Sequence, residues 1–312
     1  MRIWKGLDSI YEPFGETSLA IGTFDGVHLG HQQLITEAVS DSLHHNRPSV
    51  IFTFDRHPME LIQPDRFQGY LTTPEQKIKY LESLGCDHMV IAHFDSTLRD
   101  TDAEAFLKKV THSLMGAKTI YVGEDFRFGR KQTGDVQFLK ERQTAYGYEL
   151  HARSLVLMNG MKVGSSEIRQ LLKVGAIAEA NEMLSRPYTL AGKVTEGRML
   201  GRTIGYPTAN LHRKTNQIIP ADGIYATRVR WNGQMWKGAT SIGFRPTVGG
   251  NERTIETFLL GFEGNLYEQE IEVEFFQRLR EERHYPTLDQ LKAQIERDVE
   301  ETDRLINLQR DI

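Results

Sequence analysis

The hydrophobic pattern of the chain changes near Arg186 and Pro187. Before this point, short apolar runs of strand length alternate with stretches whose apolar residues recur at helical spacing. After it, runs bounded by glycines and a Trp-Asn-Gly-Gln turn at 231–234 are typical of antiparallel strands. A chain of 312 residues also exceeds the size of one ordinary core. The pattern therefore predicts two domains of different class, at residues 1–185 and 186–312.

The first half predicts an α/β domain. The expected elements are strands at 19–24, 50–54, 89–92 and 119–122, and helices at 74–84 and 102–114. Strands that alternate with helices form a parallel, Rossmann-like sheet with right-handed connections and helices on both faces. Ligands bind beyond the carboxyl ends of such strands. The residues that directly follow each strand are therefore the candidates for a site.

The second half predicts a compact antiparallel barrel followed by one long helix. Period-two alternation at 271–275 is typical of a half-buried strand. The helix is expected at about 287–308, and its apolar residues recur on one face. This stripe consists of Leu288, Leu291, Ile295, Val299 and Leu305. We expect it to pack on the barrel rather than on a partner helix.

Charge and composition argue against several kinds of partner. The net charge of −4 comes from well-mixed signs, without the Lys and Arg blocks that follow a nucleic-acid backbone. No apolar run approaches the ~18 residues of a membrane-spanning helix. The single cysteine, Cys86, cannot form an internal disulfide. We expect a cytoplasmic protein without nucleic-acid or membrane partners; a homo-oligomer is compatible with the sequence.

A glycine-rich motif follows the first expected strand. The run Gly-Thr-Phe-Asp-Gly-Val-His-Leu-Gly-His occupies 22–31 and leads into a helix. Its glycines allow a ligand to approach the backbone, and the helix N-terminus offers free N–H groups to a phosphate. His28 and His31 lie about one turn apart on the same side, from where both can hydrogen-bond an α-phosphate. A metal site is the alternative, but no Cys/His/Asp cluster at zinc spacing accompanies the two histidines.

This motif resembles the ATP-binding motif of the HIGH-type nucleotidyltransferases, and in particular the N-terminal domain of prokaryotic bifunctional riboflavin kinase/FAD synthetases. The runs at 53–58, 123–129 and 165–169 are similar to further motifs of that domain. The resemblance implies that MgATP adenylylates FMN to FAD, with His28, His31 and Arg169 as catalytic residues. The implied ATP-binding residues are Gly22, Thr23, Phe24, Asp25, Gly26, His28, His31, Ser165 and Arg169. The implied FMN-binding residues are His57, Asp125, Phe126 and Phe128.

The second half carries its own motif at 197–210. Gly197, Gly201 and Gly205 stand at four-residue intervals ahead of Pro-Thr-Ala-Asn. Loops this rich in glycine can wrap a polyphosphate with backbone N–H groups, although a flexible hairpin would have the same composition. Thr208 and Asn210 are two residues apart, so in a strand their oxygens face the same way and can coordinate Mg²⁺.

The 197–210 motif resembles that of riboflavin kinases, which use a six-stranded barrel. Similar runs follow at 220–226, 242–247 and 256–260. The resemblance implies that ATP phosphorylates riboflavin to FMN, and that Glu256 accepts the proton of the ribityl 5′-hydroxyl. The implied ATP-binding residues are Gly197, Gly201, Gly205, Thr208, Asn210 and Tyr225. The implied flavin-binding residues are Arg245 and Glu256, and the implied magnesium ligands are Thr208 and Asn210.

Two alternatives to a bifunctional flavin enzyme stay open at this point. Departures from the family pattern at Ser166, Glu167 and Gln132 are compatible with a kinase that has lost adenylylation. A flavin-sensing module without turnover is the second alternative. A sensor has no need of a catalytic base or of a histidine pair, and the chain carries both at the expected positions. The sequence therefore favours the bifunctional enzyme.

Overall fold

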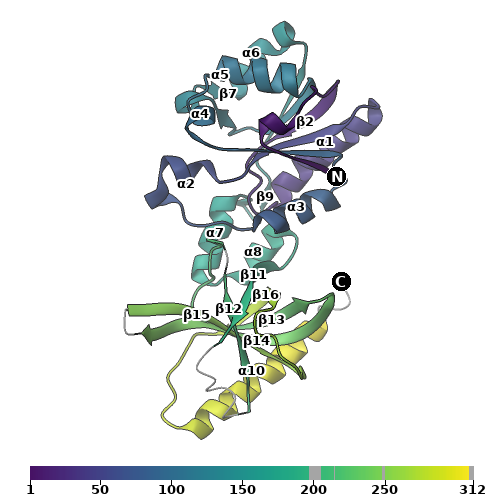
Figure 1. Ribbon diagram of the computed structural model, residues 1–312. Coiled ribbons are helices and arrows are strands. Elements are labelled where there is room, and N and C mark those ends of the chain that lie inside the picture. The colour runs from purple at the N-terminus through teal and green to yellow at the C-terminus, as the bar shows by residue number, and fades with distance from the viewer. Residues whose placement is uncertain (197–204, 214, 248–249, 309–312) are drawn as a thin grey trace. The chain divides into compact units, whose positions relative to one another are not determined.

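The structure is a computed structural model that describes residues 1–196, 205–213, 215–247 and 250–308 (Figure 1). Of residues 245–247 and 250–252 only the backbone is described. Backbone contacts divide the chain into two compact units, which are described separately below. The first unit comprises residues 1–68 and 74–165, and the second comprises 69–73 and 166–312. The change in strand type falls near 185, but the residues from 166 onward group with the second unit.

The first unit is built on a six-stranded sheet in which all neighbouring strands are parallel. Its strands are β1 (Arg2–Lys5), β2 (Thr17–Ile21), β3 (Ser49–Phe54), β4 (His88–Ala92), β5 (Ala117–Gly123) and β8 (Glu149–Arg153). Their order in the sheet is β1-β4-β3-β2-β5-β8. The order of successive strands reverses between β2 and β5. The predicted parallel sheet is confirmed.

Helices cover both faces of this sheet. They are α1 (Leu29–His44), α3 (Pro74–Ser83), α4 (Ser96–Arg99), α5 (Ala103–Phe106), a π-helix η3 (Leu107–Leu114) and α6 (Val136–Tyr146). A further short helix, α2 (Pro58–Ile62), packs on the 3-10 turn that follows it. Ala20 packs with residues of α1 and α3, whereas its neighbour Leu19 packs with residues of η3 and α6. Successive residues of β2 therefore enter two different cores, as the continuous apolar run predicts. The helix predicted at 102–114 continues beyond α5 as a π-helix.

Short elements complete the first unit. Three single turns of 3-10 helix are η1 (Leu7–Ser9), η2 (Pro64–Arg66) and η4 (Arg130–Gln132). Two short antiparallel pairs are β6 (Arg127–Phe128) with β7 (Gly134–Asp135), and β9 (Leu157–Met158) with β10 (Met161–Lys162). The first pair lies in the segment that follows β5, and the second precedes the end of this unit.

The second unit contains a closed, six-stranded antiparallel barrel. Its strands are β11 (Tyr188–Thr195), β12 (Thr208–His212), β13 (Gly223–Trp231), β14 (Gln234–Thr247), β15 (Gly250–Leu259) and β16 (Glu270–Arg280). Their order is β11-β12-β15-β14-β13-β16, and β16 pairs with β11 to close the barrel. Two helices, α7 (Ser165–Val174) and α8 (Ile177–Leu184), precede it, and α8 packs on β11 and β16. The predicted barrel is confirmed.

The last helix, α10 (Leu288–Leu308), packs on β13 and β14 (Figure 1). The predicted apolar stripe is only partly correct, because Leu288 is 53% exposed. The residues that are buried on this helix are Asp298, Thr302 and Ile306. Asp298 is tolerated there because Arg280 of β16 forms an ion pair with it, with Nη2 and Oδ2 2.7 Å apart. No helix within the described ranges is both long and apolar enough to span a membrane.

Candidate active sites

The first candidate site lies where the strand order of the parallel sheet reverses. β2 and β5 are neighbours, with Ala20 paired to Tyr121. The turn at 22–28 follows β2, and the segment 123–129 follows β5. Both segments therefore leave the sheet at the same edge, at the switch point where sheets of this kind bind ligands. The fold thus brings together the two segments that the sequence predicted on the ATP side and on the flavin side.

The turn after β2 has an unusual backbone. Phe24, Gly26 and Val27 all have positive φ, at 49°, 82° and 41°. The left-handed region costs a non-glycine residue roughly 1–2 kcal/mol. A side chain at Gly22 would collide with the ring of Phe24, since a Cβ there would lie 2.9 Å from it. The ring of Phe24 is itself buried in the core, so the predicted ATP contact of Phe24 is left to its backbone.

Three side chains hold the carbonyl oxygens of this turn. The hydroxyl of Thr53 donates to Thr23 O at 3.0 Å. The hydroxyl of Ser165 donates to Asp25 O at 2.9 Å. The amide of Gln32 donates to Val27 O at 2.8 Å. With alternate carbonyls fixed, a backbone that is costly by itself is held in one conformation. Ser165, predicted to bind ATP, therefore also shapes the turn.

His28 and His31 form a stacked pair at the start of α1. Their ring centroids lie 3.6 Å apart, with an angle of 21° between the planes. His28 is the N-cap residue of α1, and its Nδ1 accepts a hydrogen bond from the backbone N–H of His31 at 3.4 Å. The ring of His31 also meets that of Phe24 edge-on, at 5.3 Å. Across the described residues, no group of three or more His, Cys, Asp or Glu side chains could hold a metal ion.

Arg169 belongs to the second unit, on α7. Its side chain is buried, and Nε donates to the carbonyl of Gly69 at 2.9 Å. This hydrogen bond fixes the position of Nε, the guanidinium nitrogen nearest the backbone. The predicted contact of Arg169 with ATP stays a prediction.

The predicted flavin-side residues have different surroundings. Asp125 is exposed and forms an ion pair with Lys162 of β10, with Oδ2 and Nζ 3.2 Å apart. Phe126 stacks on Phe128, with ring centroids 5.4 Å apart. Phe128 is buried against Phe106, so it supports Phe126 from the core. Its predicted contact with FMN stays a prediction.

His57 is the N-cap residue of α2. Its Nδ1 accepts a hydrogen bond from the backbone N–H of Met59 at 3.1 Å. Its ring lies 5.4 Å from that of Phe67, tilted by 31°. The side chain is half-buried, so part of the ring stays accessible. Its predicted role towards FMN stays a prediction.

The second candidate site lies on the barrel, where β12 pairs with β15. Asn210 lies opposite Glu256 in the register of the two strands. The hydroxyl of Thr208 donates to Oε2 of Glu256 at 3.2 Å. Thr208 and Asn210 share one face of β12, because side chains two residues apart in a strand point the same way. Three oxygen-bearing side chains from two separate motifs therefore meet on one face of the barrel.

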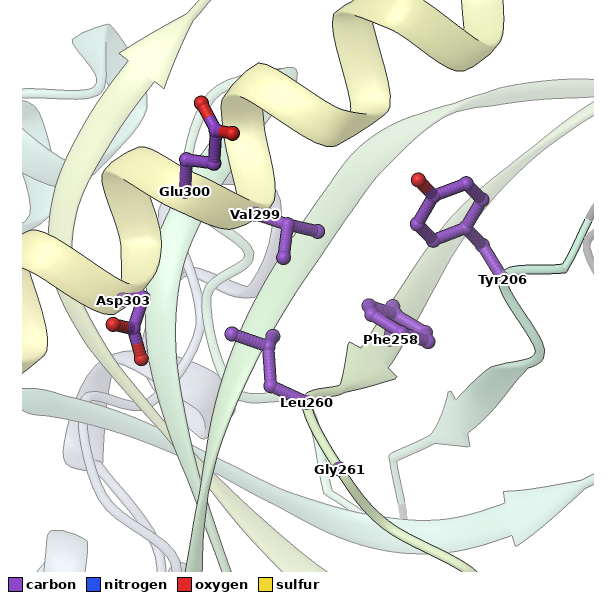
Figure 2. Close-up of a pocket in the computed structure, with 7 residues that line it drawn as sticks. All are labelled: Tyr206, Phe258, Leu260, Gly261, Val299, Glu300 and Asp303. Carbon is purple, nitrogen blue, oxygen red and sulfur yellow. The ribbon is translucent and has the colours of Figure 1, made fainter.

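A pocket of about 500 Å³ opens between the end of β15 and α10. Figure 2 shows Phe258, Leu260 and Val299 around this space, with Tyr206 beside Phe258. Tyr206 and Phe258 meet edge-on at 5.2 Å. The remaining lining residues are Gly261, Glu300 and Asp303. No motif in the sequence indicated this pocket, although Phe258 follows Glu256 by two residues in β15 and so shares its face.

The other residues predicted for the kinase site are not seen to meet the Glu256 cluster in the described part of the chain. Gly197 and Gly201 lie outside the described residues. Gly205 has a φ of 91°, which favours glycine. Tyr225 is fully buried, its hydroxyl donates to Ala221 O, and burial raises its pKa to about 12. Its ring is thus a core residue, and the predicted ATP contact would have to use its backbone. Arg245 lies in β14, and its side chain is outside the described part.

Comparisons with known proteins agree with two domains in this order. A family model described as FAD synthetase matches residues 12–167, and one described as riboflavin kinase matches residues 184–306. The bifunctional riboflavin kinase/FMN adenylyltransferase of Haemophilus influenzae is 34% identical over 310 residues, which cover 98% of this chain and 100% of the relative. The protein of the same name in Escherichia coli K12 is 33% identical over 300 residues and covers 96% of both chains.

A solved structure extends this likeness to the fold. The crystal structure of a macrolide-efflux protein from Streptococcus pneumoniae aligns with a TM-score of 0.88 at 28% identity, covering 97% of this chain and 99% of that one. The activity in that name belongs to that protein. Two family models in the expected order, together with full-length relatives, account for both halves of the sequence. The chain therefore belongs to the family of bifunctional riboflavin kinase/FMN adenylyltransferases.

Proposed function

We propose a division of the family's two reactions between residues 1–185 and 186–312. With both family domains, the chain phosphorylates riboflavin to FMN and adenylylates FMN to FAD, using ATP in both steps. The kinase-only and sensor alternatives gain no support from these matches. Adenylyl transfer is assigned to the domain with the parallel sheet, and phosphoryl transfer to the domain with the barrel.

In the kinase reaction, Glu256 acts as the general base. The ribityl 5′-hydroxyl attacks the γ-phosphorus of ATP, its proton passes to the carboxylate of Glu256, and ADP leaves. The observation that carries this assignment is the 3.2 Å hydrogen bond from Thr208 to Glu256, since it orients the carboxylate on the face of the barrel that also carries Asn210. A positioned base contributes roughly 10²- to 10⁴-fold in rate.

Thr208 and Asn210 are the residues that would hold Mg²⁺ at this site. Hydroxyl, amide and carboxylate oxygens are suitable ligands for this hard cation, and substrate phosphates supply others. The strand geometry supports the assignment, because both side chains lie on the face of Glu256. When bound, the cation neutralises charge on the transferring phosphate.

The isoalloxazine ring of riboflavin is assigned to the pocket between the end of β15 and α10. The pocket volume of about 500 Å³ falls in the range of small-ligand sites. Phe258 and Tyr206 offer aromatic surface, and Leu260 with Val299 offers apolar surface. Phe258 precedes the end of β15 and stands two residues from the proposed base.

In the adenylyl reaction, the FMN phosphate attacks the α-phosphorus of ATP and pyrophosphate leaves. No covalent enzyme intermediate is needed, so the site has to position the substrates and stabilise charge. His28 and His31 donate hydrogen bonds to the α-phosphate, supported by backbone N–H groups at the start of α1. The observation in favour is the stacked pair, which presents both rings from one short segment.

Both reactions are placed in the cytoplasm, where ATP is made and used. The state of Cys86 suits a reducing compartment. It is a buried free thiol whose pKa is raised to about 12, mainly by burial. A thiol of this kind is unreactive and forms no disulfide.

One time course tests the proposal as a whole. The full chain is incubated with riboflavin and MgATP, and both flavin products are followed by chromatography. FMN should accumulate first and FAD should follow. The same assay started from FMN should give FAD directly. Failure to form FAD from FMN would exclude the assignment of adenylyl transfer, whereas failure to form FMN from riboflavin would exclude that of the kinase.

A further inference from the structure

A partly buried lysine lies behind the turn of the adenylyl-transfer site. Lys77 stands on α3, and its Nζ reaches the ends of both β2 and β3. It donates to Phe54 O at 3.0 Å, and to Thr23 O and the hydroxyl of Thr53 at 3.4 Å each. An ammonium group has three donors, and these three acceptors match them. Lysine side chains are mostly exposed, so a partly buried lysine that directs its ammonium group to three protein oxygens calls for a reason.

All three acceptors of Lys77 are neutral oxygens, so no single partner cancels its charge. Burial lowers the pKa of Lys77, and the nearby carboxylates of Asp25 and Asp55 oppose that effect. An apolar side chain would fill the same space without the cost of drawing a charge partly out of water. The lysine therefore offers something that an apolar residue cannot, namely several hydrogen bonds from one point to separate segments.

The segments that Lys77 joins are the ones that set the turn. Thr23 O is the first of the alternate carbonyls that fix residues 22–27, and it accepts from both Thr53 and Lys77. Phe54 O ends β3, the neighbour of β2 on the side away from β5. Lys77 thus ties the turn, which holds costly positive φ values at Phe24 and Val27, to an adjacent strand of the sheet.

We propose that Lys77 is a positioning residue for adenylyl transfer, which ties the turn at 22–27 to the end of β3 and so fixes where His28 and His31 meet the α-phosphate. The inference rests on the proposed assignment of that reaction to the first domain. Lys77 touches neither substrate nor reacting atom in this scheme. It acts through the backbone that carries the histidine pair, and a small displacement of such a group can cost a large factor in rate.

The test compares Lys77→Met, Lys77→Arg and the matched control Lys140→Met in the full chain. Lys140 is exposed on α6 of the same unit. FAD formation from saturating FMN is measured while MgATP is varied. We expect kcat/KM for ATP to fall roughly 10- to 100-fold in Lys77→Met. Lys77→Arg keeps the charge and some hydrogen-bond donors. The logarithm of its kcat/KM should therefore lie above that of Lys77→Met by at least a third of the difference between Lys77→Met and wild type. Lys140→Met should behave as wild type, and all three should phosphorylate riboflavin normally.

Hydrogen exchange distinguishes positioning from plain stability. In Lys77→Met, amide exchange should accelerate at 22–28 and stay unchanged in β4 and β5. Faster exchange throughout the sheet in both Lys77 variants would make Lys77 an ordinary stability residue and overturn the proposal. Unchanged ATP kinetics in Lys77→Met would overturn it as well. His28→Ala is assayed in parallel to test the assignment of the reaction. If this variant forms FAD at a rate near that of wild type, the assignment itself is wrong. If FAD formation falls in His28→Ala but not in Lys77→Met, only the role of Lys77 is refuted.

Discussion

Thr208 donates a hydrogen bond to Glu256 across the β12–β15 pair, at 3.2 Å between Oγ1 and Oε2. The two residues are 48 positions apart in sequence and come from different motifs. The hydrogen bond orients the carboxylate and holds it on the face that also carries Asn210 and the edge of the pocket. The catalytic and metal-binding parts of the proposed kinase site are thereby joined in one cluster.

Replacing Glu256 by Gln should stop the kinase reaction selectively. The amide keeps the size of the side chain but cannot accept the proton of the 5′-hydroxyl, so FMN formation should fall roughly 10²- to 10⁴-fold. FAD formation from supplied FMN should be unchanged. Glu263→Gln is the control, because Glu263 is exposed in the loop after β15. Kinase activity within a few-fold of wild type in Glu256→Gln would remove Glu256 from the mechanism.

Replacing Phe258 by Ala should weaken riboflavin binding. Loss of an aromatic contact costs about 1–2 kcal/mol, so KM for riboflavin should rise roughly 5- to 30-fold. The KM for ATP and the rate of FAD formation should stay unchanged. Phe262→Ala is the matched control, since its ring packs against Trp236 rather than lining the pocket. Equal effects of both substitutions on the KM for riboflavin would contradict a flavin in this pocket.

The sequence predicted the four central strands of the first unit because they are largely buried on both sides. Such strands appear as continuous apolar runs, and the glycine-rich turns between them are local signals. The edge strands β1 and β8 were not predicted, and both are largely exposed. The first strand was predicted to run to residue 24, but β2 ends at Ile21, and this error has a local cause. Residues 22–24 look like more strand, but Phe24 takes a positive φ so that its ring folds into the core beneath the turn. A hydrophobic pattern reports burial and not the direction of the backbone.

The second site depends on contacts that no local pattern encodes. Thr208 meets Glu256 only because of the register between β12 and β15. The pocket depends on how α10 docks, and the buried face of that helix carries Asp298, which a search for apolar residues passes over. Its ion pair with Arg280 makes that burial possible. Tyr225 shows the reverse case, since a residue chosen by motif turned out to be part of the core.

Replacing His28 by Ala should abolish FAD formation and spare FMN formation. Removing a hydrogen-bond donor to the charge that develops on the α-phosphate should cost roughly 10²- to 10³-fold. His44→Ala at the far end of α1 is the control, because His44 is exposed there. Both activities are measured on the same preparation, so intact kinase activity accounts for enzyme concentration. Comparable losses in the two reactions would contradict the division of labour between the domains.

The strongest acid sensitivity of the first unit should come from Asp41, at the opposite end of the sheet from the histidines. Burial alone would raise the pKa of Asp41, but hydrogen bonds from Ser18, Arg47 and Thr119 lower it to about 2. The ion pair with Arg47 is close, at 2.6 Å between Nη2 and Oδ2. His45 also lies 3.0 Å from the other carboxylate oxygen.

The sign of this effect follows from the lowered pKa. The unfolded chain binds the proton near pH 3.8 and the folded chain only near pH 2, so the stabilisation is fully present above about pH 4 and is lost as the pH falls towards 2. Asp41→Asn should cost about 1–3 kcal/mol at pH 7, because Arg47 keeps a buried charge without its partner. The difference from wild type should shrink between pH 4 and pH 2.

Urea unfolding at pH 7, 4 and 3 measures this difference. Trp4 reports on the first unit once Trp231 and Trp236 are replaced by phenylalanine, since the chain has 3 tryptophans. Asp8→Asn, an exposed carboxylate on η1, serves as the control and should leave the pH dependence unchanged. A constant gap between Asp41→Asn and its parent at all three pH values would show that Asp41 stabilises by packing rather than by charge. Both enzymatic activities of Asp41→Asn at pH 7 should match wild type, because Asp41 bonds to residues at the amino ends of β2 and β5, whereas both proposed sites lie elsewhere.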